Sequence, residues 1–179
     1  APSIDQFLNQ SPYQTLVHGD AKLANFCFSE NKLKVAAVDF QYVGGGCGMK
    51  DLAYFVGSCL DENDCEKLEE KILNYYFKEL KLAITIKRKD INFANLEKSW
   101  RALYPYAWCD FHRFLKGWSP SHHKLNKYSN RIASEVVRNL ELCEMAKAAA
   151  LKAGEIISCY KNTKVQVHNK DAGTNLASH

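Results

Sequence analysis

Three oxygen-bearing side chains stand close together near the start of the chain. Asp20 and Asn25 are five positions apart, and Asp39 ends the next apolar segment. Phosphoryl transfer needs a carboxylate to orient the attacking hydroxyl group and hard oxygen ligands for Mg²⁺, but little covalent chemistry from the protein. One Asp and one Asn on the same loop, with a second Asp on the next strand, supply these groups. The residue types and their spacing therefore indicate phosphoryl transfer.

The segments around these residues read as short strands joined by loops. Three apolar runs, 15–17, 25–28 and 35–40, are rich in strand-forming residues, and the polar turn 29–32 joins the last two. This arrangement predicts a loop that carries Asp20 and Asn25 and a strand that ends near Asp39. The glycine-rich stretch 44–48 that follows is expected to be flexible.

From Lys50 onward the apolar pattern becomes helical. Asp51 is a candidate N-cap for the apolar run 52–56. A helix from about Asp64 is expected to bury one face, an aromatic segment spans 92–118, and a long helix is expected over 125–160. The residues of the first buried face are Leu68, Ile72, Tyr76 and Leu80. The fold class is therefore α+β, mostly α, with one domain over 1–160 and a polar, loose tail over 161–179.

Composition and charge exclude several classes of protein. The chain has 179 residues, of which 46% are apolar and 25% charged, as is usual for globular domains. No window approaches 18 apolar residues, residues 1–10 do not form a secretory signal, and Lys87–Lys89 is the one basic run in a chain of net charge +4. Seven cysteines without a CxxC pair favour reduced thiols over disulfides or zinc. We expect a cytoplasmic protein that binds neither membranes nor nucleic acid.

The order of three motifs resembles a known superfamily. These are His18-Gly19-Asp20 with Asn25, then Asp39-Phe40-Gln41, then Asp51-Leu52-Ala53-Tyr54-Phe55. Together they resemble the aminoglycoside phosphotransferase / choline kinase superfamily, and most of all its choline-kinase-like branch that includes the ecdysteroid kinases. The resemblance implies the C-terminal lobe of the protein-kinase-like fold, with a catalytic loop at 16–29, a metal-binding strand at 35–41 and a helical body at 50–160.

The resemblance also implies roles for individual residues. Asp20 would be the catalytic base, and Asn25 and Asp39 would bind Mg²⁺. Asp51 would brace the catalytic loop, together with His18 in a structural position. The cofactors would be ATP and Mg²⁺, and the substrate a small-molecule alcohol of choline-like, aminoglycoside-like or steroid-like type.

The aromatic segment offers a candidate acceptor pocket. Tyr106, Trp108 and Asp110 could hold a cationic head group, as aromatic and acidic side chains do in choline kinases. The alternative is that these aromatic residues form a helix-packing core. The pair His122-His123 could suggest a metal site, but adjacent histidines do not share a helical face, which favours a solvated loop.

Elements of a complete kinase are expected to be missing. No glycine-rich phosphate loop precedes a strand lysine, and residues 44–48 come too late in the chain to be that loop. The chain is therefore expected to be a fragment without its nucleotide-binding lobe, and to self-associate through the face left open. The alternatives are a non-catalytic kinase-like binding module and a protein-kinase lobe, against which Gly19 and the lack of an Ala-Pro-Glu segment count.

A weaker resemblance concerns the end of the chain. Residues 146–157, with Lys170 and Asn175-Leu176, resemble the opening helix of inositol-monophosphatase-like proteins. An alanine-rich amphipathic helix produces the same pattern without any relationship.

Overall fold

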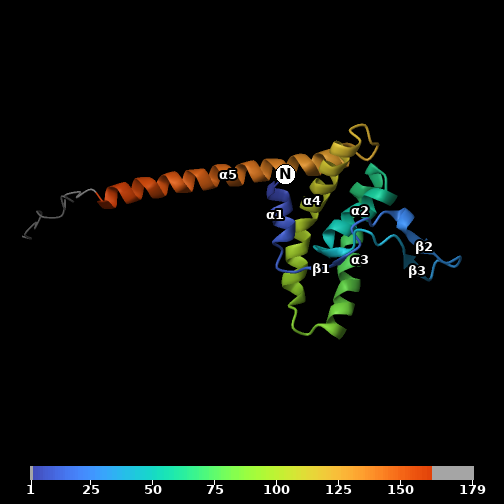
Figure 1. The fold of residues 1–179 in the computed structure, drawn as a ribbon. Helices are drawn as coiled ribbons and strands as arrows, with labels where there is room; N and C mark the ends of the chain where they lie inside the picture. Colours follow the sequence, from blue (N-terminus) through green and yellow to red (C-terminus); the bar gives the residue numbers. More distant parts are fainter. Residues whose placement is uncertain (1, 163–179) are drawn as a thin grey trace, which may run out of the picture. The chain divides into compact units, whose positions relative to one another are not determined.

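A computed structural model describes residues 2–162, which are mostly helical (Figure 1). This confirms the coarse prediction of an α+β, mostly α chain. Of the described residues, 2–138 belong to one compact unit and 139–162 to a second. In chain order the elements are α1 (Pro2–Asn9), β1 (Thr15–Val17), the 3-10 turn η1 (Leu23–Asn25), β2 (Phe26–Phe28), β3 (Val35–Ala37), β4 (Gly44–Gly46), α2 (Met49–Cys59), α3 (Glu62–Lys87), α4 (Phe93–Trp118) and α5 (Lys127–Asn162).

Some expectations concern residues that are not described. The predicted loose tail, apart from residues 161 and 162 at the end of α5, lies outside the described residues. The same is true of Lys170 and Asn175-Leu176. Among the helices of residues 2–162, none is long and apolar enough to span a membrane.

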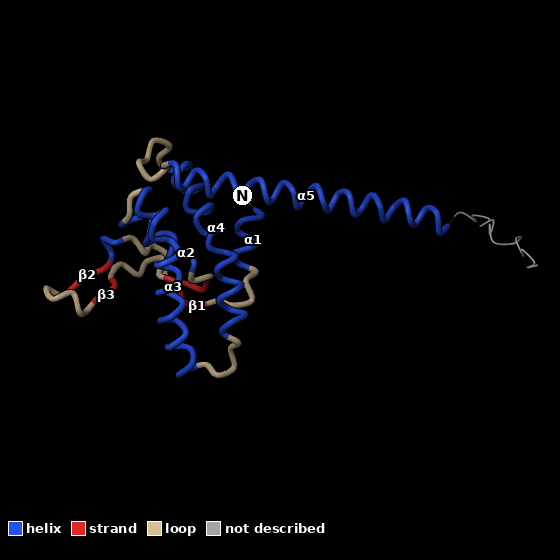
Figure 2. The backbone as a smooth tube through the Cα atoms, turned by 180° about the vertical axis from the view of Figure 1, so that it is seen from behind, coloured by secondary structure: helices blue, strands red, loops and turns tan. Residues whose placement is uncertain are grey.

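The strands form two separate antiparallel pairs, drawn as short red segments in Figure 2. β1 pairs with β4, so that Val17 lies opposite Gly44, and β2 pairs with β3, so that Phe26 lies opposite Ala37. The prediction that residues 44–48 are merely flexible was wrong, because three of these glycines form a strand. Val17 packs closely over Gly46, where a Cβ atom would lie 3.1 Å from its Cγ2.

The third predicted strand is shorter than expected. It ends at Ala37 rather than Phe40. Asp39 has a φ of 63°, in the left-handed region, which a continuous strand cannot contain. The backbone therefore turns at Asp39.

Helix α4 carries more of the buried apolar residues than any other element of the first unit. Its buried side chains include Trp100, Tyr104, Trp108 and Phe111. α1, α2 and α3 all pack on it (Figure 1), and α2 does so most extensively. The small residues of α2 permit this approach, because Gly57 brings the helix backbone against the two rings of Trp108 and Phe111.

Two details of the helical prediction were wrong. Gly48, not Asp51, occupies the N-cap position of α2, and Asp51 lies in the first turn with its carboxylate turned toward another segment. In α3 the fully buried residues are Cys65, Leu73 and Phe77, whereas the predicted core residues are only half-buried. The pattern was read about one residue out of register, because α3 has a second, partly apolar face.

Substitution of Gly57 tests the close packing of α2 on α4. A Cβ atom at residue 57 would lie 2.9 Å from Phe111 and 3.0 Å from Trp108, both buried. Gly57→Ala is therefore expected to destabilise the fold by about 1–2 kcal/mol in urea unfolding, although alanine favours helices. The control is Gly117→Ala in α4, where a Cβ atom meets nothing within 4 Å. This variant is expected to stabilise slightly, and equal effects of the two substitutions would contradict the packing argument.

Candidate active site

The loop that carries Asp20 folds back on itself. The Lys22 backbone N–H donates to the Asp20 carbonyl (2.8 Å), and the Asn25 N–H donates to the Lys22 carbonyl (2.9 Å). This tight turn brings the side chain of Asn25 beside Asp20. Its amide nitrogen Nδ2 donates to the Asp20 carbonyl oxygen (2.9 Å) and to Asp20 Oδ2 (3.0 Å), and both residues are buried. Because Nδ2 is the donor, the amide oxygen of Asn25 has no part in these bonds and is left as an acceptor.

Lys22 is a site residue that the sequence reasoning missed. Its ammonium Nζ lies 2.7 Å from Asp20 Oδ2. The hydrogen bond to Asp20 raises the pKa of Lys22, and the charge of Asp39 adds to this effect. The ammonium is therefore attracted by both carboxylates. Its position two residues after Asp20, inside a tight turn, was the available signal.

Asp20 is ionised in this surrounding. Burial alone would raise its pKa, but hydrogen bonds from Lys22, Tyr54 and Asn25 outweigh burial and lower the pKa below its ordinary value of 3.8. Since the pKa is lower in the folded state, ionisation of Asp20 stabilises the fold above pH 3.8 and this contribution is lost as the pH falls through the folded pKa.

Tyr54 is a second residue that was not assigned a role. Burial, and then its hydrogen bond with Asp20, raise the pKa of Tyr54 to about 12. The phenol therefore stays protonated at neutral pH and can act as a donor to the carboxylate. Tyr54 follows Asp51 by three residues on α2, so both residues face the loop from the same side of the helix.

Asp51 and His18 hold the loop by hydrogen bonds to its backbone. The two carboxylate oxygens of Asp51 accept hydrogen bonds from the backbone N–H groups of His18 (2.6 Å) and Gly19 (3.0 Å). His18 accepts from the Asp20 N–H at Nδ1 (3.3 Å), and its Nε2 donates to the Val38 carbonyl (2.9 Å). These bonds tie the loop to helix α2 and to the segment just before Asp39.

Loss of the Asp51 carboxylate should loosen the loop. Asp51→Ala leaves the His18 and Gly19 N–H groups without their charged acceptor, so we expect a loss of about 2–4 kcal/mol in the free energy of unfolding. Faster hydrogen exchange at these two amides is expected in the same variant. The control is Asp90→Ala, which removes an exposed carboxylate paired with Arg88 and should change neither measurement appreciably. Unchanged exchange in Asp51→Ala would show that the loop does not depend on this brace.

Asp39 lies at the exposed edge of the site. The Val38 N–H donates to the Asn25 carbonyl (3.0 Å), so residues 38 and 39 run beside the end of the loop. The carboxyl side chain of Asp39 is exposed, on a backbone in the left-handed region. Non-glycine residues held in this region cluster at functional sites. The structure thus brings Asp20 and Asn25 into direct contact, and the backbone bond of Val38 to Asn25 brings the segment that carries Asp39 beside them.

The candidate metal ligands, Asn25 and Asp39, do not form a cluster of His, Cys, Asp and Glu side chains. Within residues 2–162, no group of three or more such side chains could hold a metal ion. Asn25 and Asp39 are of a different kind, because one ligand would be an amide oxygen. Such mixed sites suit Mg²⁺, which takes one or two carboxylates and completes its ligands from water and phosphate.

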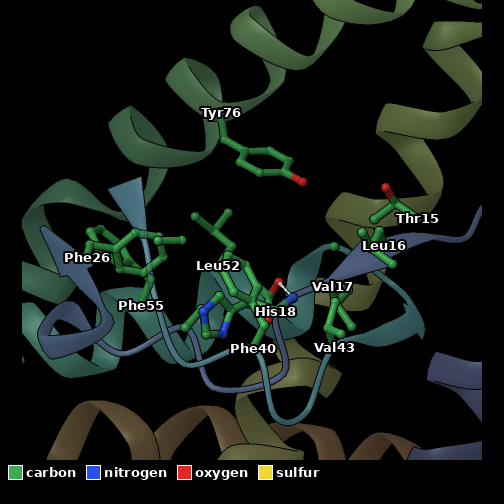
Figure 3. Close-up of a pocket in the computed structure, with 14 residues that line it drawn as sticks. Thr15, Leu16, Val17, His18, Phe26, Phe40, Val43, Leu52, Phe55 and Tyr76 are labelled. Atoms are coloured by element: carbon green, nitrogen blue, oxygen red, sulfur yellow. Dashed lines mark hydrogen bonds between the residues drawn. The ribbon is translucent and has the colours of Figure 1, made fainter. Parts of the chain in front are cut away.

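A cavity of about 450 Å³ lies behind the loop (Figure 3). Its walls are mostly apolar: Leu52 and Phe55 come from α2, Tyr76 reaches it from α3, and His18 and Phe40 close it beside the loop. Asp20, Asn25 and Asp39 do not line it. His18 and Asp51, which hold the loop, therefore line the cavity, whereas the Asp20 carboxylate does not.

The candidate acceptor residues lie on α4. Trp108 is buried, with its ring packed edge-on against Tyr128. Tyr106 lies against Phe7 of α1, at 5.0 Å between ring centroids, and Asp110 pairs with Arg113 at 2.7 Å. These contacts are with helices, and the role of the three residues in an acceptor pocket stays a prediction. In the loop before α5, His122 and His123 stack on one another at 4.5 Å.

Comparison with protein-family models gives a match to a kinase-like family. Residues 3–88 match the model of the ecdysteroid kinase-like family, somewhat less than half of the chain, and this confirms the resemblance to that branch. The matched segment contains Asp20, Asn25, Asp39 and Asp51. No curated protein and no solved structure matches the chain.

Proposed function

We propose that this chain is the C-terminal lobe of a kinase-fold phosphotransferase that transfers the γ-phosphoryl group of ATP to a hydroxyl group of a small molecule. The observation that carries the proposal is the contact of Asp20 with both Asn25 and Lys22. It supplies an ionised carboxylate, an amide oxygen and an ammonium group within one turn of chain. Phosphoryl transfer depends on positioning and charge stabilisation, which these groups provide.

Each residue has a part in the proposed reaction. Asp20 orients the acceptor hydroxyl and takes its proton as the oxygen bonds to phosphorus, while the bond to the β-phosphate oxygen breaks and ADP leaves. Lys22 can turn from Asp20 to the phosphoryl oxygens, because its side chain is 41% exposed. Tyr54 keeps the Asp20 carboxylate in position. His18 and Asp51 hold the loop.

Asn25 and Asp39 fit the requirements of a magnesium site. Asn25 keeps its amide oxygen available while its nitrogen is engaged by Asp20, and Asp39 offers an exposed carboxylate. When bound, Mg²⁺ supplies positive charge that offsets the phosphate oxygens. The seven cysteines, none of them in a disulfide in the described residues, suit the reducing cytoplasm, where we propose that the protein works.

Exposed apolar side chains near the site support a second lobe. Leu16 is 75% exposed, Phe40 54% and Tyr42 64%, and Phe28 and Val43 are also exposed. Exposed apolar side chains that gather near one site can mark an interaction surface. We propose that a nucleotide-gripping lobe from outside the described residues covers it, and that the chain alone transfers phosphate slowly.

The same surface predicts self-association of the chain. Without its cover, the apolar face and the free edges of the two-stranded sheets should recruit a second copy. Sedimentation velocity at micromolar concentrations is expected to show dimers that Phe40→Ser with Tyr42→Ser shifts toward monomer. A strictly monomeric chain at these concentrations would contradict the self-association.

The function is tested by transfer of labelled γ-phosphate from ATP to three alcohols: choline, an aminoglycoside and a hydroxylated steroid. We expect slow labelling of one class of alcohol that stops when EDTA removes Mg²⁺. Labelling of none, with saturable binding of an alcohol, would favour the runner-up, a non-catalytic kinase-like binding module. That alternative is favoured by the way Lys22 and Asn25 already satisfy Asp20.

A further inference from the structure

A second concave surface lies between α2 and α3, away from Asp20. This α2–α3 groove has a volume of about 640 Å³ and is lined by Phe55, Val56, Cys59, Leu60, Leu68, Lys71, Ile72, Asn74, Tyr75 and Lys78. Both helices pack on α4, so they leave a space between them where their side chains do not meet. A volume of this size falls within the range of about 300–1,000 Å³ typical of small-ligand sites.

The groove is apolar over most of its surface. Leu68 and Ile72 are half-buried on its α3 side, and Tyr75 is 65% exposed beside them. These residues lie on the second face of α3, which the helical pattern predicted to be buried in the core. Among residues 2–162, nothing covers it. A ligand that binds in the groove should therefore have an apolar part, since the apolar walls form no hydrogen bonds with water.

The charge along the groove has one sign. Lys71 and Lys78 line it seven residues apart, about 10 Å along the helix, and no Asp or Glu is among the lining residues. Neither ammonium forms an ion pair with a carboxylate of the described chain, whereas Arg101, Arg113 and Arg131 all do. A lysine can lay its apolar stem along the wall and keep its ammonium at the rim.

We propose that the α2–α3 groove binds a single-chain amphiphile with an anionic head group. The apolar walls take the chain, and Lys71 or Lys78 pairs with the head group. The groove volume of about 640 Å³ is that of a small-ligand site, which favours such a small molecule over an acidic amphipathic helix of a protein partner, since a helix is about 10–12 Å across and needs a longer surface. The inference stands independently of phosphotransfer at Asp20.

The site adjoins the helix that holds the catalytic loop. Phe55 lines both this groove and the cavity behind His18, and its ring packs edge-on against Phe26 at 5.5 Å. The neighbouring Ser58 accepts a hydrogen bond from the Leu23 N–H of the loop (2.7 Å). A ligand bound in the groove would therefore contact α2, the helix that the loop of Asp20 also contacts.

The test uses dodecanoate, with dodecanol and dodecyltrimethylammonium as neutral and cationic counterparts, all below their micelle concentrations. Methyl NMR spectra of the full chain are expected to show saturable shifts at Val56, Leu68 and Ile72 with dodecanoate. The alcohol and the cation should bind at least about tenfold more weakly than dodecanoate, because they cannot pair with lysine. Equal binding of acid and alcohol, or shifts at other methyl groups, would overturn the proposal.

Paired variants separate this site from nonspecific charge attraction. Lys71→Gln with Lys78→Gln should weaken dodecanoate binding by about tenfold. The control, Lys98→Gln with Lys116→Gln, removes the same charge from exposed positions of α4 outside the groove and should leave binding unchanged. Equal weakening by both pairs would overturn the assignment. So would binding of an acidic amphipathic peptide in the groove by a chain that does not bind dodecanoate.

Discussion

Gly19→Ala is expected to be the most damaging single substitution in the loop. Gly19 has a φ of 79°, which a residue with a side chain adopts only under strain, and a Cβ atom there would lie 2.3 Å from the carbonyl oxygen of Tyr42. The backbone of one of the two segments must move. We expect a loss of more than about 3 kcal/mol in the free energy of unfolding, measured by urea denaturation.

Gly45→Ala is the matched control for this prediction. Its Cβ atom would meet nothing within 4 Å, and its φ is not in the left-handed region. Its stability should stay close to that of the wild type. A Gly19→Ala chain of wild-type stability, with the His18 amide still protected from exchange, would show that the loop does not approach Tyr42 as described.

Asp20→Asn is expected to have the largest effect on phosphoryl transfer. The amide cannot take the proton of the acceptor hydroxyl and no longer attracts Lys22, so transfer to the alcohol should fall by about 10²–10⁴-fold. Labelled product from ATP, measured over long incubations, gives the rate. The folded state should persist, because asparagine has nearly the same shape.

Lys22→Met separates the two effects of Asp20→Asn, because it removes the ion pair with Lys22 but keeps the Asp20 carboxylate as a base. Without the ammonium, the strongest interaction that lowers the pKa of Asp20 is gone, so the pKa should rise toward its ordinary value. Carboxyl ¹³C titration measures this shift without any need for activity. An unchanged pKa of Asp20 in Lys22→Met would contradict the ion pair, and transfer unaffected by Asp20→Asn would remove Asp20 from the reaction.

The contact between Asp20 and Asn25 could be expected from sequence because it depends on local spacing. Asp20 and Asn25 lie within one loop, and a single tight turn joins them, so no long-range information was needed to bring them together. Asp51 also was recognised, although its carboxylate binds loop N–H groups 32 and 33 residues away and does not cap its own helix. The motif identified the residue, while its position in the helix was misread.

What the sequence did not reveal depended on tertiary contacts. Gly44–Gly46 has little strand propensity of its own, and it forms a strand because β1 offers a partner. Lys22 is an ordinary surface lysine until the turn brings it to Asp20. In α3, two apolar faces compete, and the packing of α4 decides that Leu73 and Phe77 are buried while Leu68 and Ile72 line the groove.

Phosphotransfer at this loop requires a single cation site shared by Asn25 and Asp39. The direct test is paramagnetic line broadening by Mn²⁺, a substitute for Mg²⁺, in the ¹⁵N spectrum of the chain. Broadening should be strongest at Asn25, Asp39 and Phe40, should strengthen when ATP is added, and should disappear in Asp39→Asn but not in Asp90→Asn. Broadening that is spread over the exposed acidic residues of the helices, or that survives Asp39→Asn, would contradict a phosphotransfer site at this loop.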